Sequence, residues 1–356
     1  MDEVIVKMKN ACFQSVDQAA VHGWIGVLLL EGFSSLSVGS ILEPFSILRN
    51  LNFKHSPAVR IFSIADESVR SSSGLSVVCD LLSSDVEDTF NRHLAPRAII
   101  ICGPTITPSH EKSIAPFLRR ARQYGIPLFG VGQAAWHMAE SGLLFGKSAT
   151  LHWSCLAAFS EKFSRVDTEN ALFVCDEFGG TCAGETATLD FIIGLIGSFA
   201  PEHTTEICNA LLISQVRPSN SNQPGSQSAR LRHVPPALAR AAQIMADDLE
   251  NSQPISAIAE FCGVSVRQLE RLFREHLSTS PAKYRIALRT ERGKELLLHT
   301  ELSLREVACA VGYSSVAAFS KKFRSATNLS PTEFRSELAN KKRFGEPVWH
   351  IATEAT

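Results

Sequence analysis

Two stretches in the last third of the chain carry basic side chains on what would be one face of a helix. In the first, Arg267, Arg271 and Arg274 lie opposite Leu269 and Phe273, whose spacing predicts a buried helical stripe. A basic helical face can contact the phosphates and base edges of a DNA major groove. The side chains that we expect to contact bases are Arg267, Glu270 and Arg271 in the first stretch and Val316, Ala317 and Lys321 in the second.

The two stretches belong to an internal repeat, in which residues 255–285 are similar to residues 303–335. Such a repeat indicates one supersecondary unit used twice. In each copy a short helix with a small residue on its packing face precedes a glycine, where the chain can turn. A serine then stands where it can cap a second helix. The pattern predicts two helix–turn–helix units.

Charge is divided unevenly along the chain, although the formal net charge is only −1. Residues 1–228 hold 16 Lys+Arg and 22 Asp+Glu, whereas residues 229–347 hold 19 and 13. Chance variation in surface charge would explain this equally well. If the division is functional, only the second part of the chain meets a polyanion such as double-stranded DNA.

The composition of the 356 residues, with 45% apolar and 20% charged side chains, is typical of a globular protein of two or three domains. We expect no signal peptide, because the start lacks an apolar stretch, and no membrane span, because no apolar run reaches about 18 residues. These features predict a cytoplasmic protein. The nine cysteines are scattered without a C-x-x-C pair, so we expect no disulfide framework and no zinc site. We expect no other metal and no cofactor.

The first two thirds of the chain alternate apolar runs with amphipathic stretches, which predicts an α/β fold with a mostly parallel sheet and helices on both faces. Expected strands are 24–30, 58–65, 98–102, 127–131 and 172–175, and expected helices are 38–50, 109–124, 134–141 and 183–199. A stretch rich in Ser, Asn, Gln, Gly and Pro at 217–229 predicts a linker. The predicted parts are an extension at 1–20, an α/β domain at 21–213, a linker at 214–232, an all-α domain at 233–338 and a tail at 339–356.

The repeat resembles the DNA-binding domain of the AraC/XylS transcription regulators. The resemblance implies two helix–turn–helix units that bind adjacent segments of the major groove. It rests on A-x-x-x-G-V-S (259–265), L-x-R-L-F (269–273) and S-P-x-x-Y (280–284) in the first copy, and on V-A-x-x-x-G-Y-S-S (307–315), F-x-x-x-F-R (319–324) and L-S-P-x-x-F-R (329–335) in the second.

A long helix at about 281–298 is expected to join the two units, as in that family. Within it, Thr290 and Gly293 replace the Leu and Ala that are usual in the family. A glycine inside a helix costs about 1 kcal/mol relative to alanine. We therefore expect a looser joint that still folds.

The front domain is similar to the PfpI-like, class I glutamine amidotransferase-like α/β fold. Together with the helical domain, this layout resembles the amidase-like branch of the AraC family, whose members sense small metabolites such as arginine, glycine betaine or carnitine. The matching stretches are GFSSLSVGSILEP (32–44), IIICGP (99–104), GVGQAAWHMAESGLLFGKSATLHW (130–153) and TCAGETATLDFIIGLI (181–196).

The enzymes of this fold carry a nucleophilic cysteine in G-x-C-x-G, on a sharp turn between strand and helix. Here Gly132 fills the cysteine's position and has no side chain that can attack a substrate. The resemblance makes Glu43 the acidic residue facing this turn and His152 a potential base, but neither replaces the nucleophile. Cys102, Cys155 and Cys182 remain as possible nucleophiles, but none of them lies on the turn, and the simpler interpretation is that each is a buried small residue. We expect no catalytic residues and no enzyme activity.

A pocket is expected to remain, because the carboxyl ends of strands in an open α/β sheet form a crevice for small molecules. Trp136 and Trp153 beside the carboxylate of Glu43 would suit a cationic ligand, since aromatic faces attract quaternary ammonium groups. The alternative is that both tryptophans are ordinary core residues. The expected lining is Glu43, Gly103, Gly132, Gln133, Trp136, His152, Trp153 and Cys182.

These observations predict a transcription regulator, an activator by analogy with the family, that responds to a small-molecule effector. A homodimer and a contact with RNA polymerase are expected partners. One alternative is an active thiol hydrolase or amidase with an appended nucleic-acid-binding domain, which Gly132 argues against. Another is a constitutive DNA-binding protein whose sensor domain has lost its ligand.

Overall fold

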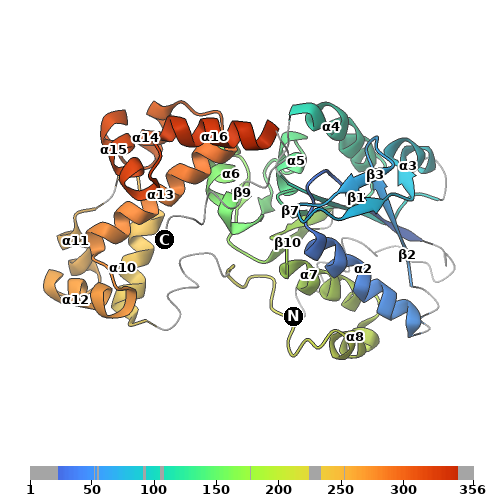
Figure 1. Cartoon of the computed structure of the whole chain (residues 1–356). Helices are drawn as coiled ribbons and strands as arrows, with labels where there is room; N and C mark the ends of the chain where they lie inside the picture. Colours follow the sequence, from blue (N-terminus) through green and yellow to red (C-terminus); the bar gives the residue numbers. More distant parts are fainter. Residues whose placement is uncertain are drawn as a thin grey trace. The chain divides into compact units, whose positions relative to one another are not determined.

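The computed structural model describes residues 23–343 except 52, 54–55, 91–93, 105–107, 177, 224–233 and 252. The chain divides into two compact units, Met1–Gln223 and Pro224–Thr356 (Figure 1). The predicted extension at 1–20, linker residues 224–232 and the tail from 344 onwards lie outside the described residues.

The first unit is built on a seven-stranded sheet with the order β10-β11-β7-β6-β1-β2-β5. Adjacent strands are parallel except for β10 and β11, as the α/β prediction requires. The strands are β1 (Trp24–Leu29), β2 (Ala58–Ser63), β5 (Leu81–Leu82), β6 (Ala98–Gly103), β7 (Leu128–Gly132), β10 (Phe173–Asp176) and β11 (Gly179–Cys182). Two further pairs are β3 (Ser68–Arg70) with β4 (Ser76–Val78), and β8 (Ser148–Ala149) with β9 (Asp167–Thr168).

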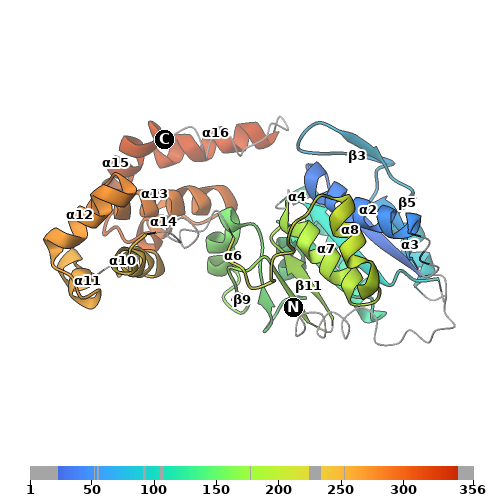
Figure 2. The ribbon, with the colours of Figure 1, turned by 90° about the horizontal axis from the view of Figure 1, so that it is seen from below.

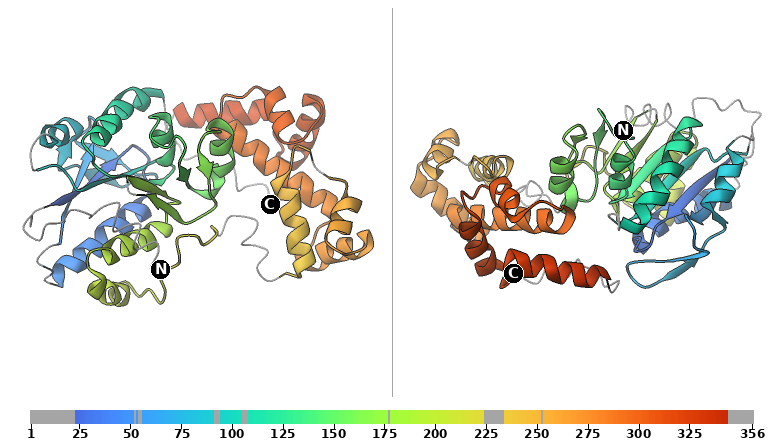
Figure 3. Two further views of the ribbon diagram at one scale, coloured as in Figure 1. Left: turned by 180° about the vertical axis from the view of Figure 1, so that it is seen from behind. Right: turned by 90° about the horizontal axis from the view of Figure 1, so that it is seen from above.

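Helices cover both faces of this sheet, and the views from below and behind show the same layers (Figures 2 and 3). One face carries α2 (Ser35–Asn50), α7 (Ala187–Gly197) and α8 (Thr204–Ala210); the other carries α3 (Ser83–Thr89), α4 (Pro108–Gln123) and α5 (Ala135–Glu140). Beyond α5 lie the 3-10 turn η1 (Trp153–Cys155) and α6 (Leu156–Lys162), and η2 (Pro201–His203) precedes α8.

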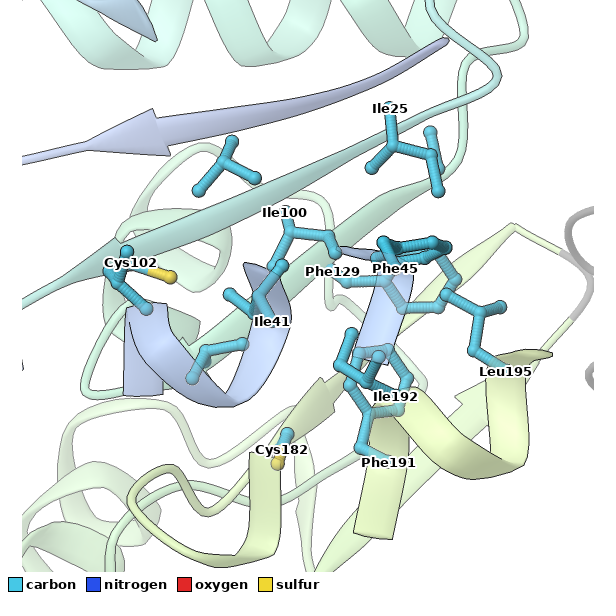
Figure 4. Close-up of a cluster of buried hydrophobic side chains, with 14 of the residues drawn as sticks. Ile25, Ile41, Phe45, Ile100, Cys102, Phe129, Cys182, Phe191, Ile192 and Leu195 are labelled. Atoms are coloured by element: carbon cyan, nitrogen blue, oxygen red, sulfur yellow. The ribbon is translucent and has the colours of Figure 1, made fainter. Parts of the chain in front are cut away.

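The apolar runs of the sequence form the core between these layers. On one face, side chains of α2 and α7 such as Phe45 and Ile192 pack on Ile100 and Phe129 of the central strands (Figure 4). On the other face the rings of Phe62 and Phe117 lie 5.6 Å apart. Burial of these side chains is the main favourable contribution to folding of the unit.

Strand β11 is the main element that the sequence does not predict. The helix expected at 183–199 begins only at Ala187, and Gly179–Cys182, just before the expected helix, form a strand parallel to β7. Its first residue, Gly179, has φ +137°, and a Cβ there would collide with the backbone of Leu128 on the neighbouring strand. Glycine thus permits a close approach between strands, although in a sequence it indicates a turn.

The first unit also continues past its predicted end at 213. Residues 217–223, which we call the docked segment, hydrogen bond to the unit at several points. Arg217 pairs with Asp190 of α7, and the carbonyl of Ser219 accepts from the amides of Leu172 and Phe173 at 2.8 and 3.3 Å. The side chain of Gln223 is buried. The polar composition that predicts a linker here instead supplies hydrogen bonds.

The described part of the second unit is helical throughout, as predicted. Its elements are α10 (Pro236–Asp247), α11 (Ile255–Phe261), α12 (Val266–Leu277), α13 (Pro281–His299), α14 (Leu304–Ala310), α15 (Val316–Thr327) and α16 (Pro331–Arg343). Leu269 and Phe273 of α12 pack in one buried cluster with Ile258 of α11. In the second copy the rings of Phe319 and Phe323 lie 5.4 Å apart in an equivalent position.

Helix α13 joins the two copies as expected, and Gly293 lies within it at a close contact with α15. Gly293 is buried, and a Cβ there would lie 3.0 and 3.2 Å from two ring carbons of Phe319. The glycine lets α13 and α15 pack closely at this point. Thr290, also buried, donates its hydroxyl to the carbonyl of Ile286 at 2.9 Å.

Within the described ranges, none of the helices combines the length and apolar character needed to span a bilayer. In the same ranges no three or more His, Cys, Asp or Glu side chains cluster as metal ligands would.

Candidate functional site

The carboxyl ends of β1, β6, β7 and β11 meet at one edge of the sheet, because these strands run parallel. Gly103 at the end of β6 is paired with Gly132 at the end of β7, and Cys182 at the end of β11 is paired with Val131. Three of the predicted lining residues therefore lie side by side. Gln133, half-buried, follows β7 directly.

Gly132 keeps the backbone geometry of a nucleophile turn but offers no nucleophile. Its φ is +66°, in the left-handed region, and the turn leads into α5. A Cβ built on Gly132 would lie 3.9 Å from the Cα of Gly184, so a side chain has room here. The space that a cysteine side chain would occupy is therefore present, but glycine places no side chain in it.

Glu185, which is not among the residues predicted from the sequence, follows β11 and lies beside this turn. Its neighbour Gly184 packs so closely on Gly132 that a Cβ on Gly184 would lie 2.7 Å from the Cα of Gly132. Glu185 has φ +49°, which costs a non-glycine residue about 1–2 kcal/mol. Its amide donates to Ser37 Oγ at 2.8 Å, and Ser34 Oγ donates to its carboxylate at 2.8 Å. The exposed carboxylate is thus held in a strained, defined position.

The structure does not bring Glu43 to this edge. It lies exposed on α2, six residues beyond Ser37, or about 9 Å further along the helix axis. Ser37, near the start of α2, is the residue of that helix that contacts the loop after β11. The sequence signal for Glu185 is its place in the matching stretch TCAGETATLDFIIGLI (181–196), from which only Cys182 was a predicted site residue.

His152 caps the turn η1, and Trp153 is its first residue. The side chain of His152 is half-buried and that of Trp153 is exposed. Burial lowers the pKa of His152, and the negative charge of Glu185 partly opposes this. His152 Nδ1 lies 2.8 Å from Ser154 Oγ and accepts from the amide of Ser154 at 3.5 Å, which places the proton of the neutral ring on Nε2. Trp153 is 39% exposed, and its ring lies 5.5 Å from that of His152.

Trp136 is a core residue rather than an exposed aromatic face. It is only 2% exposed and packs edge-on against Phe159 and Phe163, with ring centroids 5.6 and 5.4 Å away. Its indole nitrogen donates to Glu140 at 3.1 Å, and the ammonium of Lys162 lies 5.2 Å from its ring. A cation of the chain itself therefore already occupies the face that we expected a ligand to use.

The cysteines near the edge are poorly suited to nucleophilic attack. Burial raises the pKa of the Cys182 thiol to about 12 and that of Cys102 still further. Both thiols therefore stay protonated at neutral pH, whereas the thiolate is the reactive form. Cys155, in η1, is also buried.

A pocket of about 560 Å³ lies at the opposite edge of the sheet, where β7 and β11 begin. None of the predicted lining residues belongs to it. Its wall contains the Lys147–Asp176 ion pair at 2.6 Å, and Arg122 lies over the ring of Phe178 at 4.0 Å. Because Lys147 and Asp176 are engaged with each other and the predicted lining residues lie elsewhere, we place the candidate effector site at the carboxyl edge instead.

Both helix–turn–helix units form as the repeat predicts. In the first, Gly263 turns the chain with φ +70°, and Ser265 Oγ accepts from the amide of Gln268, whose side chain accepts from the amide of Ser265. In the second, Gly312 has φ +77° and Ser315 Oγ accepts from the amide of Ala318. These caps define where α12 and α15 begin.

The residues predicted to contact bases lie mostly on exposed surface. Arg267, Glu270 and Arg271 of α12 are exposed, and so are Ala317 and Lys321 of α15, whereas Val316 is half-buried. Arg271 lies 3.9 Å from Glu275 one turn later, a weak pairing at an exposed position that leaves the guanidinium available.

Comparisons with known proteins agree with this architecture. The DJ-1/PfpI family matches residues 25–197, and a helix-turn-helix domain family matches residues 258–337. The HTH-type transcriptional regulator GbdR of Pseudomonas aeruginosa is 31% identical over 91% of this chain and 86% of its own length. The regulator GlxA of Rhizobium meliloti is 31% identical over 87% and 95%, and the regulator CdhR of P. aeruginosa 29% identical over 90% and 94%.

Among solved structures, an AraC family transcriptional regulator from Pseudomonas putida matches with a TM-score of 0.47 and 20% identity, over 53% of this chain and 99% of its own. The fold, the two helix–turn–helix units and the full-length relatives together define a DNA-binding transcription regulator and not an enzyme. The chain belongs to the AraC-family regulators that carry a DJ-1/PfpI domain before the DNA-binding domain.

Proposed function

We propose that a small cationic metabolite binds at the carboxyl edge of the sheet and controls DNA binding by this regulator. The observation that carries the proposal is Glu185, an exposed carboxylate held in a strained conformation beside Gly132, where no nucleophile stands. Residues held in sparsely populated backbone conformations cluster at ligand sites. A turn between strand and helix that retains this backbone geometry without a nucleophile suits binding rather than reaction.

The charges at the edge favour a cationic effector. His152, whose pKa is lowered by burial, is neutral at pH 7 and does not neutralise Glu185. The partly exposed ring of Trp153 is an aromatic face, to which quaternary ammonium groups are attracted. An amino acid or a quaternary amine such as betaine or carnitine carries such a cationic group.

On DNA, we propose that α12 and α15 enter adjacent major-groove segments. Arg267, Glu270 and Arg271 would contact bases from α12. Ala317, Val316 and Lys321 would do so from α15, where the two apolar side chains suit thymine methyl groups. Activation through RNA polymerase, a homodimeric state and a cytoplasmic location complete the proposal on the strength of the family resemblance.

The effector proposal is tested by calorimetry on the full chain with glycine betaine, carnitine, choline and arginine. Loss of a charge-assisted contact costs about 1.5–3 kcal/mol, so Glu185→Gln should weaken binding roughly 10- to 100-fold. Glu43→Gln is the matched control and should bind normally, because Glu43 lies exposed on α2 away from the edge. Equal affinity of Glu185→Gln and the unaltered chain would contradict the proposed site.

The regulatory proposal is tested by genomic footprinting at fixed salt, with and without the effector. Discrete protected sites whose occupancy changes with effector are the expected result. Diffuse binding that disappears with salt would instead indicate phosphate contacts without base recognition.

A further inference from the structure

We propose that the docked segment, residues 217–223, is the output element of the effector site. It would transmit effector binding in the first unit to the chain that leads into the DNA-binding unit. The inference rests on the function proposed above, because it concerns regulation through the same site. A separate observation supports it: hydrogen bonds at the two ends of this segment join it to Thr186, which follows Glu185, and to Leu151, which precedes His152.

At one end, Arg217 is bound to the loop that carries Glu185. Its guanidinium donates to the buried carboxylate of Asp190 through Nε at 2.9 Å, and its amide donates to the same carboxylate at 2.7 Å. Its Nη2 also donates to Thr186 Oγ1 at 3.1 Å. Thr186 directly follows Glu185 in the chain. A movement of Glu185 would therefore also move Thr186, which accepts a hydrogen bond from Arg217.

At the other end, Gln223 is bound to the segment that carries His152. Its side-chain nitrogen lies 2.9 Å from the carbonyl oxygen of Leu151, 3.0 Å from that of Ala171 and 3.1 Å from Thr150 Oγ1. Two carbonyl acceptors require that the amide nitrogen, and not its oxygen, faces inward. Gln223 is 2% exposed, and Leu151 directly precedes His152.

Between these ends, the segment is fixed to the edge of the sheet. The carbonyl of Ser219 accepts from the amides of Leu172 and Phe173, where β10 begins. Thr150, a partner of Gln223, is itself bound to the sheet, because its amide donates to Thr181 Oγ1 of β11 at 2.7 Å. The segment therefore forms one hydrogen-bonded body with both loops of the site.

The functional consequence follows from where the chain leaves the first unit. With the segment docked, the connection to the second unit starts after Gln223; with the segment released, it starts before Arg217. An effector that bridges Glu185 and His152 would hold both loops in place and so favour the docked arrangement. A ligand shifts such an equilibrium only by its difference in affinity for the two arrangements, and the coupling is reciprocal.

The decisive experiment compares Gln223→Ala with Asn222→Ala in the full chain. Asn222 is the exposed neighbour, also carries a side-chain amide and serves as the control. Operator affinity is measured by fluorescence anisotropy with and without the effector that calorimetry identifies. We expect the effector to change operator affinity several-fold in the unaltered chain and in Asn222→Ala, and not at all in Gln223→Ala. A retained effect in a folded Gln223→Ala variant overturns the inference.

A second measurement needs no known effector and remains valid if Gln223→Ala is poorly folded. Hydrogen exchange is followed at the amides of Leu172 and Phe173, which donate to Ser219, in Glu185→Ala and in the control Glu43→Ala. We expect faster exchange only in Glu185→Ala, and unchanged exchange overturns the inference. If the four probe compounds fail to bind while exchange responds as expected, the proposed effector class fails and the coupling stands.

Discussion

Gly293 in α13 offers a direct test of how the two helix–turn–helix units are joined. Replacing it with alanine should stabilise an isolated helix by about 1 kcal/mol. In the folded protein the new Cβ would lie 3.0 Å from a ring carbon of Phe319. That ring is 1% exposed and lies between Tyr313 and Phe323, with centroids 5.8 and 5.4 Å away, so it has little room to move. Overpacking of this kind costs about 1–3 kcal/mol.

The expected balance for Gly293→Ala is therefore a loss of about 1 kcal/mol in the free energy of unfolding. Urea denaturation of the second unit within the full chain measures it, and operator affinity should fall as well, because Phe319 belongs to α15. Ala287→Gly, at an exposed position of the same helix, is the control. It should lose about 1 kcal/mol through propensity alone and leave operator affinity unchanged. A Gly293→Ala variant that is more stable than the unaltered chain would refute the close-packing argument.

Other predictions concern DNA contacts and pH. Arg267→Ala and Arg271→Ala should each cost about 1–3 kcal/mol on the specific operator if they contact bases; an equal loss on random DNA would show phosphate contacts instead. Lys321→Ala should reduce footprint protection in one of the two adjacent segments only, and uniform loss across both would contradict its placement on α15. Burial raises the pKa of Glu295 from 4.5 to about 8, against the opposing charge of Arg292 3.6 Å away. At pH values between these two pKa values, Glu295 is protonated in the folded protein and ionised in the unfolded chain. The stability of the second unit should therefore fall as pH rises from about 5 to 8. Glu295→Gln should remove this slope in thermal melts, and an unchanged slope would show that another group causes it.

Much of the second unit follows from the sequence because its signals are local. A serine caps an amide three residues later at both Ser265 and Ser315, and glycine turns the chain just before each cap. Apolar residues one helical turn apart then define the buried face. None of these interactions requires knowledge of distant segments, so the repeat alone predicts both helix–turn–helix units.

The same holds for the absence of a nucleophile, since Gly132 has no side chain in any conformation. The position of the acidic group is different, because it depends on which segments meet. Glu43 and Glu185 are both glutamates near motif residues in the sequence. Only the packing of Gly184 on Gly132 places Glu185, and not Glu43, at the carboxyl edge.

Trp136 and the docked segment show the same limit. In the sequence, Trp136 suits a ligand pocket as well as a core, and residues 217–223 suit a linker. Contacts with Phe159 and Phe163 place the tryptophan in the core, and acceptors from distant parts of the chain bury Gln223. Local and covalent features of the sequence are enough to predict the two folds, the paired DNA-binding units and the missing nucleophile. The position of Glu185, the burial of Trp136 and the end of the first unit are visible only in the folded chain, because they depend on contacts between residues far apart in the sequence.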